Sequence, residues 1–202
     1  MQNLPYALPD AALIHSPGDY HCMVWIPQHT VIVLGQSNKA EQSLNMQAVE
    51  SDGIMVTKRP SGGESVILSP YTIVISVVFK AGGFENPSVY FRTMNQRIIS
   101  VLLQAGLQEV HQKGISDLSI GMKKILGSSI YRRQDKVLYH AVLNYAENPQ
   151  RMERYLAHPQ KEPDYRNGRS HQEFVTSLKE QGYRLSIAEL RSALEAAFAV
   201  PV

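Results

Sequence analysis

Residues 71–79 limit the possible folds of this chain more than any other stretch. Five of these nine positions are isoleucine or valine, and none carries a charge. β-Branched residues favour strands, and a strand without alternating polar positions is covered on both faces. The run is also far too short to cross a bilayer as a helix. We therefore expect an inner strand, with a sheet around it that is packed on both sides.

Shorter patterns place further elements before and after this strand. Apolar and β-branched residues predict strands over 21–27, 30–34, 54–58, 65–68 and 118–120, and a hairpin of 125–131 and 136–145 that turns at 132–135. Apolar residues at helical spacing predict helices over 40–51, 90–105 and 148–157. Two late helices have capping-box starts, Ser170 with Glu173 and Ser186 with Glu189.

The order of these elements indicates the fold class. Strands and helices are interspersed without strict β–α–β alternation, which favours an α+β fold with a mixed, largely antiparallel sheet flanked by helices. No linker long enough to separate two domains occurs before residue 160. We expect a single domain over 1–202, made of a core over 1–160 and a C-terminal helical extension over 161–202.

Composition argues against several functional classes. The formal net charge of the 202 residues is +2, too balanced to indicate a nucleic acid or a membrane surface as partner. A single cysteine leaves no intrachain disulfide and no cysteine zinc cluster. The first residues lack a basic segment followed by an apolar one, so we expect no signal peptide, and a cytoplasmic location fits.

The stretch 58–65 separates two apolar runs and holds the first candidate site. Adjacent Gly62 and Gly63 permit a tight turn and a close approach of the backbone to a ligand. Arg59 carries a planar fork of donors that suits phosphate or carboxylate, and Ser61 adds a hydroxyl. Such a turn can form a nest of N–H groups for an anion. By itself, the stretch is more typical of an ordinary surface hairpin turn.

A second candidate site lies within residues 116–128. Asp117 could hold a divalent metal beside phosphates, because magnesium prefers oxygen ligands, although a turn aspartate is an equally good interpretation. Lys124 could offer its ammonium to a developing negative charge, although a lone lysine is usually solvated. Lys123 is interpreted as a surface residue. His140 lies in an apolar strand, where a histidine is more often a hydrogen-bonded core residue than a ligand or base.

Other chemistry finds little support in the sequence. Cys22 is the single thiol, and no helix start or basic cluster lies near it to lower its pKa, so a packing role is favoured over that of a nucleophile. There is no P-loop, no nucleophile elbow and no dinucleotide-binding fingerprint.

Several motifs occur together in a specific order. They are Gly35-Gln36-Ser37-Asn38 after an apolar strand, Arg59-Pro60-Ser61-Gly62-Gly63, Asp117, Lys124-Ile125-Leu126-Gly127-Ser128, and Tyr139-His140 followed by Leu143-Asn144. This combination resembles the lipoate–protein ligase A family, within the wider group of biotin and lipoate ligases and transferases, from about residue 20 to residue 160. The resemblance implies a class II synthetase-like catalytic domain of the biotin and lipoate ligase type, with residues 1–160 as its ligase-like core.

The resemblance also implies a two-step reaction. Lipoate and ATP would give lipoyl-adenylate, and the lipoyl group would then move to a lysine of a carrier domain. Lys124 would be catalytic, stabilising charge on the acyl carbonyl and phosphate oxygens, and Asp117 would hold Mg²⁺ near the phosphate. Apolar strands such as 71–79 would line an acyl tunnel, where each buried methylene contributes about 0.8 kcal/mol. The implied binding residues are Arg59, Ser61, Gly62, Gly63, Glu64, Ser65, Gly127, Ser128 and His140.

The implied ligands are ATP, Mg²⁺ and lipoate or octanoate. The implied partner is the lipoyl carrier domain of a 2-oxoacid dehydrogenase or an H-type protein of glycine cleavage, with no nucleic acid and no membrane. Many ligases of the family carry an additional C-terminal domain linked to adenylate formation, whereas residues 160–202 predict two helices. Either this chain activates lipoate without that domain, or a separate accessory protein assists, or the chain only transfers an activated acyl group.

Three positions depart from the family motifs: Glu64 replaces the third glycine, Leu68 a histidine and Ser116 an asparagine. A carboxylate about 4 Å from a phosphate would cost on the order of 4 kcal/mol at an effective dielectric of about 20. Glu64 must therefore point away, bind metal or impair nucleotide binding. Two alternatives stay open: an octanoyl or lipoyl transferase with a cysteine nucleophile, and a degenerate member that binds an acyl chain or a carrier. A biotin ligase fits the motif order less well.

Residues 161–171 form a basic stretch beyond the core, with Tyr165, Arg166, Arg169 and His171. This stretch could close over the ligand or meet an acidic carrier domain. A solvated loop before a capped helix is an equally good interpretation.

Overall fold

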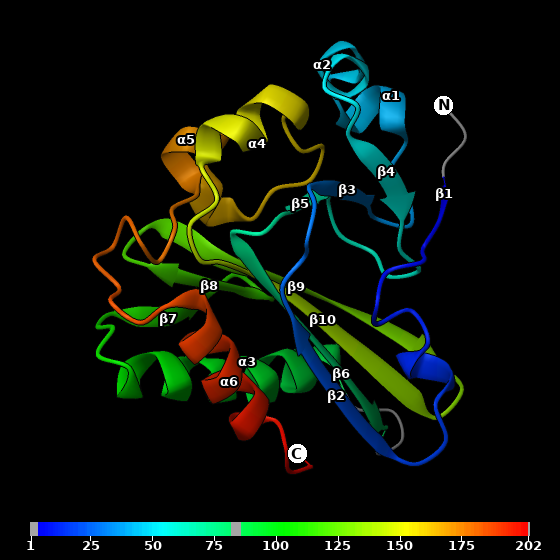
Figure 1. Ribbon diagram of the computed structural model, residues 1–202, viewed down its shortest axis with the longest axis vertical. Coiled ribbons are helices and arrows are strands. Elements are labelled where there is room, and N and C mark those ends of the chain that lie inside the picture. The colour runs from blue at the N-terminus through cyan, green and yellow to red at the C-terminus, as the bar shows by residue number, and fades with distance from the viewer. Residues whose placement is uncertain (1–3, 82–85, 202) are drawn as a thin grey trace.

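The computed structural model describes residues 4–81 and 86–201, which form two sheets with helices around them (Figure 1). The larger sheet has the strand order β2-β6-β10-β9-β8-β7, and all neighbouring strands are antiparallel. Its strands are β2 (Tyr20–Trp25), β6 (Thr72–Lys80), β7 (Val110–Lys113), β8 (Asp117–Ile120), β9 (Lys123–Arg133) and β10 (Lys136–Asn144). The expected inner strand is β6, which lies between β2 and β10 and is buried up to Phe79.

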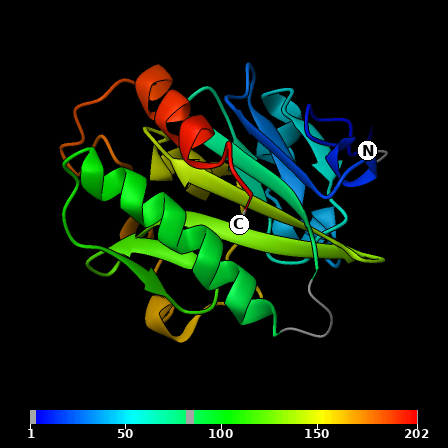
Figure 2. The same ribbon diagram turned by 90° about the horizontal axis from the view of Figure 1, so that it is seen from below.

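The alternating side chains of β6 and β10 serve two different layers, because successive residues of a strand point to opposite faces. One set packs into the main core with α3 (Pro87–Gln104) and α6 (Ile187–Ala197), which cover one face of the sheet (Figure 2). This set comprises Ile73, Ile75, Val77, Phe79, Val137, Tyr139, Ala141 and Leu143. The intervening residues face the smaller sheet and the N-terminal segment, and this second face carries the cavity described below.

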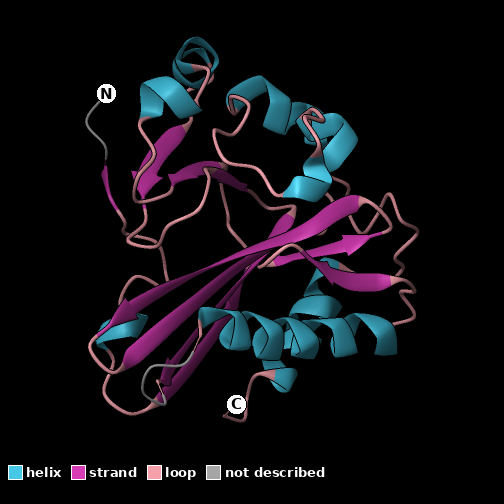
Figure 3. Cartoon of the chain, turned by 180° about the vertical axis from the view of Figure 1, so that it is seen from behind, coloured by secondary structure: helices cyan, strands magenta, loops and turns pink. Residues whose placement is uncertain are grey.

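The smaller sheet has the order β1-β4-β3-β5, with parallel pairing of β4 to β1 and β3 and antiparallel pairing of β3 to β5. Together with α1 and α2 it forms a layer on the side of the large sheet opposite α3 (Figure 3). Its strands are β1 (Leu4–Pro5), β3 (Val31–Leu34), β4 (Met55–Lys58) and β5 (Val66–Leu68). The associated helices are α1 (Ala40–Ser43), α2 (Met46–Ser51), α4 (Pro149–Tyr155) and α5 (His171–Phe174).

The predicted fold class is confirmed: the chain has an α+β fold with a largely antiparallel sheet flanked by helices. Both capping boxes are present, at the starts of α5 and α6. Within residues 4–81 and 86–201, no helix is both long enough and apolar enough to cross a bilayer. The division into a core over 1–160 and an extension over 161–202 stays a prediction.

The single helix predicted over 40–51 is wrong, since two short helices occupy this stretch. Leu44 is extended and forms a β-bridge with Leu156, which breaks the helical hydrogen bonding. Asn45 then caps α2 by accepting a hydrogen bond from the Ala48 backbone N–H at 3.3 Å. Asparagine favours such caps over helix interiors, so Asn45 starts a second helix once the bridge to Leu156 has ended the first.

Four short elements escaped the sequence patterns, and the first of them is the two-residue strand β1. Strand β7 is an edge strand in which Val110 alone is fully buried, so it carries no apolar alternation. The basic stretch 161–171 contains a 3-10 turn, η2 (Asp164–Arg166), and the segment before β2 contains another, η1 (Leu13–His15).

Candidate active site

The glycine turn joins β4 to β5 and is organised from within by Arg59. The Arg59 guanidinium donates to Ser61 Oγ at 3.0 Å, to the Gly62 and Glu64 carbonyls at 2.8 and 2.9 Å, and to the Val33 carbonyl at 3.3 Å. The residue is 7% exposed. In this arrangement its donors hold the turn together, and contact of Arg59 with a ligand stays a prediction.

The turn packs closely on the residue that follows β3, and two glycines, Gly35 and Gly63, permit this contact. A Cβ on Gly35 would lie 1.8 Å from the Gly63 carbonyl oxygen, so Gly35 admits the turn at this distance. Gly63 has a φ of +89°, which L side chains rarely adopt. The Gln36 N–H donates to the Ser61 carbonyl at 2.9 Å and fixes the turn against the strand.

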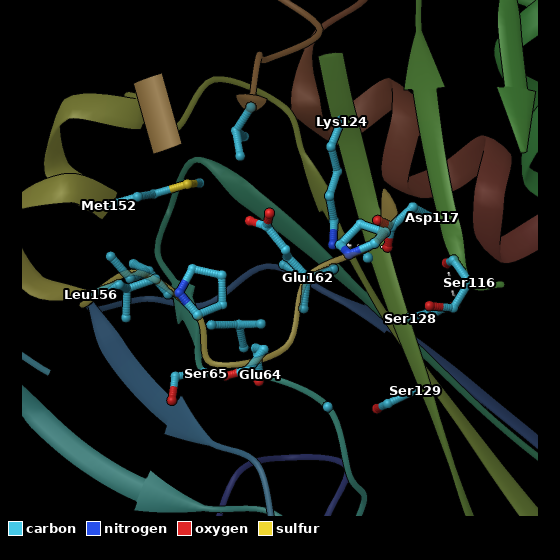
Figure 4. Close-up of a pocket in the computed structure, with 18 of the residues that line it drawn as sticks. Glu64, Ser65, Ser116, Asp117, Lys124, Ser128, Ser129, Met152, Leu156 and Glu162 are labelled. Atoms are coloured by element: carbon cyan, nitrogen blue, oxygen red, sulfur yellow. Dashed lines mark hydrogen bonds and ion pairs between the residues drawn. The ribbon is translucent and has the colours of Figure 1, made fainter. Parts of the chain in front are cut away.

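Lys124 and Asp117 form an ion pair on adjacent strands, with 2.8 Å between Nζ and Oδ1 (Figure 4). Asp117 is in register with Gly127 across the β8–β9 pair. A Cβ on Gly127 would lie 2.8 Å from the Lys124 ammonium nitrogen, so the lysine side chain lies directly over this glycine. The Lys–x–x–Gly spacing thus has a steric reason, because the lysine occupies the space that any other side chain would fill.

Ser128 and Tyr165 complete the surroundings of this pair. Ser128 Oγ donates to the Ser116 carbonyl at 2.7 Å, and Tyr165 donates to Asp117 Oδ2 at 2.9 Å. Burial first, then the charge and hydrogen bond of Asp117, raise the pKa of Tyr165 above its ordinary value, so the phenol keeps its proton and acts as donor. Lys124, Asp117 and Tyr165 therefore form one continuous array.

A cavity of about 900 Å³ joins the two predicted stretches. It lies between the sheets and beneath residues 157–166, which we call the covering segment. The predicted residues that line it are Arg59, Gly63, Glu64, Ser65, Asp117, Lys124, Gly127, Ser128 and His140. Ser61 and Gly62, in the same turn, do not line the cavity, and Ser61 Oγ lies 3.0 Å from Ser129 Oγ.

Glu64, the residue in place of a third glycine, lines the cavity and is held by neutral donors. Its Oε2 accepts from the Asn38 side chain at 3.4 Å and its Oε1 from the Lys161 backbone N–H at 3.3 Å. Figure 4 shows Glu64 and Glu162 in the same pocket as Lys124. The carboxylate lies beside the cavity and ties the covering segment to the glycine turn.

His140 has both a core contact and a cavity position. Its Nε2 lies 2.9 Å from Asp10 Oδ2, and Asp10 is completely buried and accepts from the hydroxyls of Tyr6 and Ser76. Burial opposes the charge of Asp10, but the hydrogen bonds and charge of His140, helped by both hydroxyls, hold its pKa below the ordinary value. His140 is thus a buried residue paired with Asp10 that also lines the cavity, and its contact with a ligand stays a prediction.

Cys22 has the environment of a packing residue. It pairs with Val77 on β6, on the face covered by α3 and α6 and away from the cavity. Burial first, and the charge of Glu195 second, raise the pKa of its thiol to about 12.

Asp117 is the predicted metal ligand, and it lies beside Lys124 in the cavity lining. Within the described residues, no group of three or more His, Cys, Asp or Glu side chains is arranged to hold a metal. Asp117 already pairs both oxygens with Lys124 and Tyr165, but a carboxylate has about four lone-pair sites. Mg²⁺ commonly takes one or two carboxylates and fills the rest of its shell with phosphate oxygens and water, so Asp117 fits that ion when phosphates are bound.

Sequence reasoning missed the functional surroundings supplied by Tyr6, Asp10 and Tyr165. Tyr165 stood in the basic stretch without a role, because nothing in its neighbourhood indicates a partner 48 residues away. Tyr6 and Asp10 lie in a proline-rich lead-in with no strand or helix pattern.

Comparison with known proteins assigns the family. The model of the lipoyl protein ligase A/B catalytic domain matches residues 5–199. Lipoate-protein ligase A subunit 1 of Thermoplasma acidophilum is 26% identical over 172 residues, which cover 81% of this chain and 65% of that protein. This chain therefore spans less than two thirds of the length of that relative.

Solved structures agree in fold. A bipartite lipoate protein ligase from Thermoplasma acidophilum, solved with an E2 lipoyl domain, superposes with a TM-score of 0.81 at 24% identity, over 94% of this chain and 75% of that one. A lipoate-protein ligase A bound with ATP gives a TM-score of 0.79 at 25% identity, over 94% of this chain and 76% of that one. The chain belongs to the lipoyl protein ligase A/B catalytic domain family.

Proposed function

We propose that this protein is a lipoate–protein ligase, which joins lipoate and ATP into lipoyl-adenylate and passes the lipoyl group to a lysine of a carrier domain. The observation that carries the proposal is the position of the Lys124 ammonium. It lies over Gly127, which is in register with Val142 on the cavity face of the sheet. A positive charge thus lies at one end of an apolar surface. A fatty acid needs this arrangement, because its carboxylate is charged and its chain is apolar.

Each step makes a separate demand on these residues. In the first step the lipoate carboxylate attacks the α-phosphate of ATP and pyrophosphate leaves. In the second step the carrier lysine amine attacks the acyl carbonyl and AMP leaves. The Lys124 ammonium would stabilise the charge that develops on the acyl and phosphate oxygens. Asp117 positions that ammonium, and Tyr165 orients Asp117.

Nucleotide binding places Asp117 and Glu64 in different roles. We propose that Asp117 contributes one oxygen to Mg²⁺, which would neutralise phosphate charge. Glu64 is hydrogen-bonded to neutral groups, so its charge opposes any phosphate that comes close. ATP is expected to bind more weakly than in a relative with glycine at this position.

The similar proteins suggest the partners. One similar structure is a bipartite ligase with its E2 lipoyl domain, and the relative described above is one subunit of a ligase. We propose a lipoyl carrier domain as the acceptor and a separate accessory protein that assists adenylate formation. The thiol-dependent transferase alternative has no support, because Cys22 lies on the face of the sheet away from the cavity.

The test is lipoylation of a purified lipoyl domain, measured by mass spectrometry. One reaction contains lipoate, ATP and Mg²⁺, and the other contains synthetic lipoyl-adenylate. Modification in both indicates a complete ligase, and modification from the adenylate alone indicates that an accessory protein supplies activation. No modification in either reaction would contradict the proposal and favour a binding-only member.

Substitution of Lys124 tests the mechanism. Loss of one preorganised charge-stabilising donor typically costs 10²–10³-fold in rate, so Lys124→Ala should lower transfer from lipoyl-adenylate by about that factor. Lys123→Ala is the matched control, because Lys123 is exposed and lies outside the cavity lining. Transfer by Lys124→Ala at the wild-type rate would remove Lys124 from the mechanism.

A further inference from the structure

The cavity ends abruptly along β10. Val142 and His140 line it, two residues apart on one face of the strand. Leu138, the next residue on that face, instead packs against the buried Ile14 of the N-terminal segment. The open face of β10 therefore stops at His140.

The neighbouring strand β6 shows the same limit. Thr72 and Val74 line the cavity. Ser76, the next residue on that face, is completely buried and donates to Asp10. Ser76 is also in register with His140, so the two strands close the cavity at the same level.

Tyr6 closes the space between these strands and the smaller sheet. It lines the cavity, and its ring centroid lies 5.9 Å from that of His140. It also packs on the apolar cluster that joins the two sheets through Val33 and Val74. The Tyr6 hydroxyl donates to Asp10 at 2.8 Å, and Asp10 holds His140 as well. The polar ends of both rings thus turn to Asp10, which leaves ring surface toward the cavity.

The strand register gives the distance from the catalytic lysine to this wall. Gly127, beneath the Lys124 ammonium, pairs with Val142, and Ser129 pairs with His140. Two residues of strand correspond to about 7 Å. Between them the walls are apolar, formed by Val33, Leu68, Val74 and Val142. A medium-length acyl chain with its carbonyl at Lys124 would reach the wall with its tail.

We propose that Tyr6, held by Asp10 against His140, is the end wall of the acyl channel and sets the longest chain that the protein accepts. This inference rests on the proposed function, because it places the acyl carbonyl at Lys124. The ligand class is a medium-chain fatty acyl group, such as octanoyl or lipoyl, whose tail meets ring surfaces. The segment before β2 is accordingly part of substrate selection.

The test compares octanoate with dodecanoate in binding to the full chain, measured by calorimetry. The wild-type protein should bind octanoate more tightly. Tyr6→Ala removes the ring and should raise the affinity for dodecanoate, relative to octanoate, by tenfold or more. Tyr6→Phe keeps the ring and should retain the wild-type ratio. Tyr71→Ala, at an exposed tyrosine outside the cavity lining, is the control for loss of a tyrosine and should also retain it.

Thermal melting shows whether each variant is folded, and Tyr6→Leu, which keeps apolar packing, makes the same comparison if Tyr6→Ala does not fold. An unchanged chain-length ratio in folded Tyr6→Leu or Tyr6→Ala would overturn the end wall. Transfer from lipoyl-adenylate to the lipoyl domain is measured in parallel. If the wild-type protein transfers the lipoyl group but the Tyr6 variants keep the wild-type chain-length ratio, only this inference is contradicted. If the ratio shifts but the wild-type protein transfers nothing, the end wall is supported and the ligase function is contradicted. Binding of neither acid by the wild-type protein would overturn both.

Discussion

At the residue scale, the site depends on the small size of Gly127 as well as on the charge of Lys124. A Cβ at Gly127 would lie 2.8 Å from Lys124 Nζ, 2.9 Å from Lys124 Cε and 3.7 Å from Asp117 Oδ1. The lysine end is flexible, so it would move aside while the strand stays in place. Gly127→Ala should therefore lower lipoyl transfer by about 10²-fold, through displacement of the ammonium, with a small effect on folding.

A double-mutant cycle separates this displacement from other effects of the added methyl group. In the Lys124→Ala background no lysine is displaced, and Gly127→Ala should be neutral or stabilise by about 0.4–1 kcal/mol through the unfolded chain. The free energies of unfolding in urea should then show a coupling of about 0.5–1 kcal/mol between the positions. Additive effects would mean that Lys124 does not lie over Gly127.

The sequence could supply some of these residues and not others. Arg59, Asp117 and Lys124 occur in motifs whose order is specific, so a local pattern was sufficient to find them. Tyr6 binds Asp10 in the N-terminal segment, and Tyr165 binds Asp117 on β8. Neither tyrosine lies in a motif that would mark it as a site residue. Long-range packing alone brings them to the site.

At the level of elements, two of the hydrogen bonds that hold the covering segment over the cavity go to predicted site residues. The Lys161 backbone N–H donates to Glu64 Oε1 at 3.3 Å, and Tyr165 donates to Asp117 at 2.9 Å. Glu64→Gly removes the first contact, so the Lys161 amide should exchange with solvent deuterium several-fold faster, as expected for loss of about 1 kcal/mol. Hydrogen–deuterium exchange read by NMR or mass spectrometry measures this change.

Glu64→Gln is the matched variant, because its amide oxygen can still accept the Lys161 hydrogen bond while the charge is gone. Its exchange rate at Lys161 should stay close to that of the wild-type protein. Equal acceleration in both variants would show that charge, rather than the hydrogen bond, holds the segment. Unchanged exchange in Glu64→Gly would show that the contact does not hold it at all.

Elements were predicted where pattern and packing agree. The inner strand β6 and the β9–β10 hairpin carry strong apolar runs, and the sequence located both. The break at Leu44 was missed because its cause is a bridge to Leu156, more than a hundred residues later. Edge strand β7 was missed because a strand with one fully buried residue has no pattern to read.

The whole molecule builds one cavity from distant parts of the chain. The N-terminal segment closes one end, the glycine turn and β9 supply the polar groups, and the covering segment lies over the other end. Asp10 lies in the N-terminal segment and His171 lies just after the covering segment, and both are buried groups whose pKa is lowered in the folded protein. Since folding fixes the protonation state of both, the stability of the whole protein should depend on pH.

His171 controls the first stage of that dependence. It is 7% exposed, and burial, followed by the charge of Arg166, lowers its pKa to about 4, although Glu153 at 3.5 Å opposes the shift. The unfolded histidine has a pKa of about 6.5, so between pH 6.5 and 4 the unfolded chain binds a proton that the folded chain does not. The free energy of unfolding should therefore decrease as the pH is lowered from 6.5 to 4, by on the order of 3 kcal/mol in total.

Asp10 controls a second stage at lower pH. Its folded pKa lies below that of an unfolded aspartate, about 3.9, so its stabilising contribution is present above that pH and is lost as the pH falls through the folded value. Urea unfolding measured from pH 8 to pH 3 should show both stages in the wild-type protein. His171→Gln cannot gain the proton and should flatten the curve between pH 6.5 and 4, whereas Asp10→Asn should flatten the part below about pH 4. A His171→Gln curve with the wild-type slope between pH 6.5 and 4 would contradict the assignment, because some other group would then have to bind the proton on unfolding.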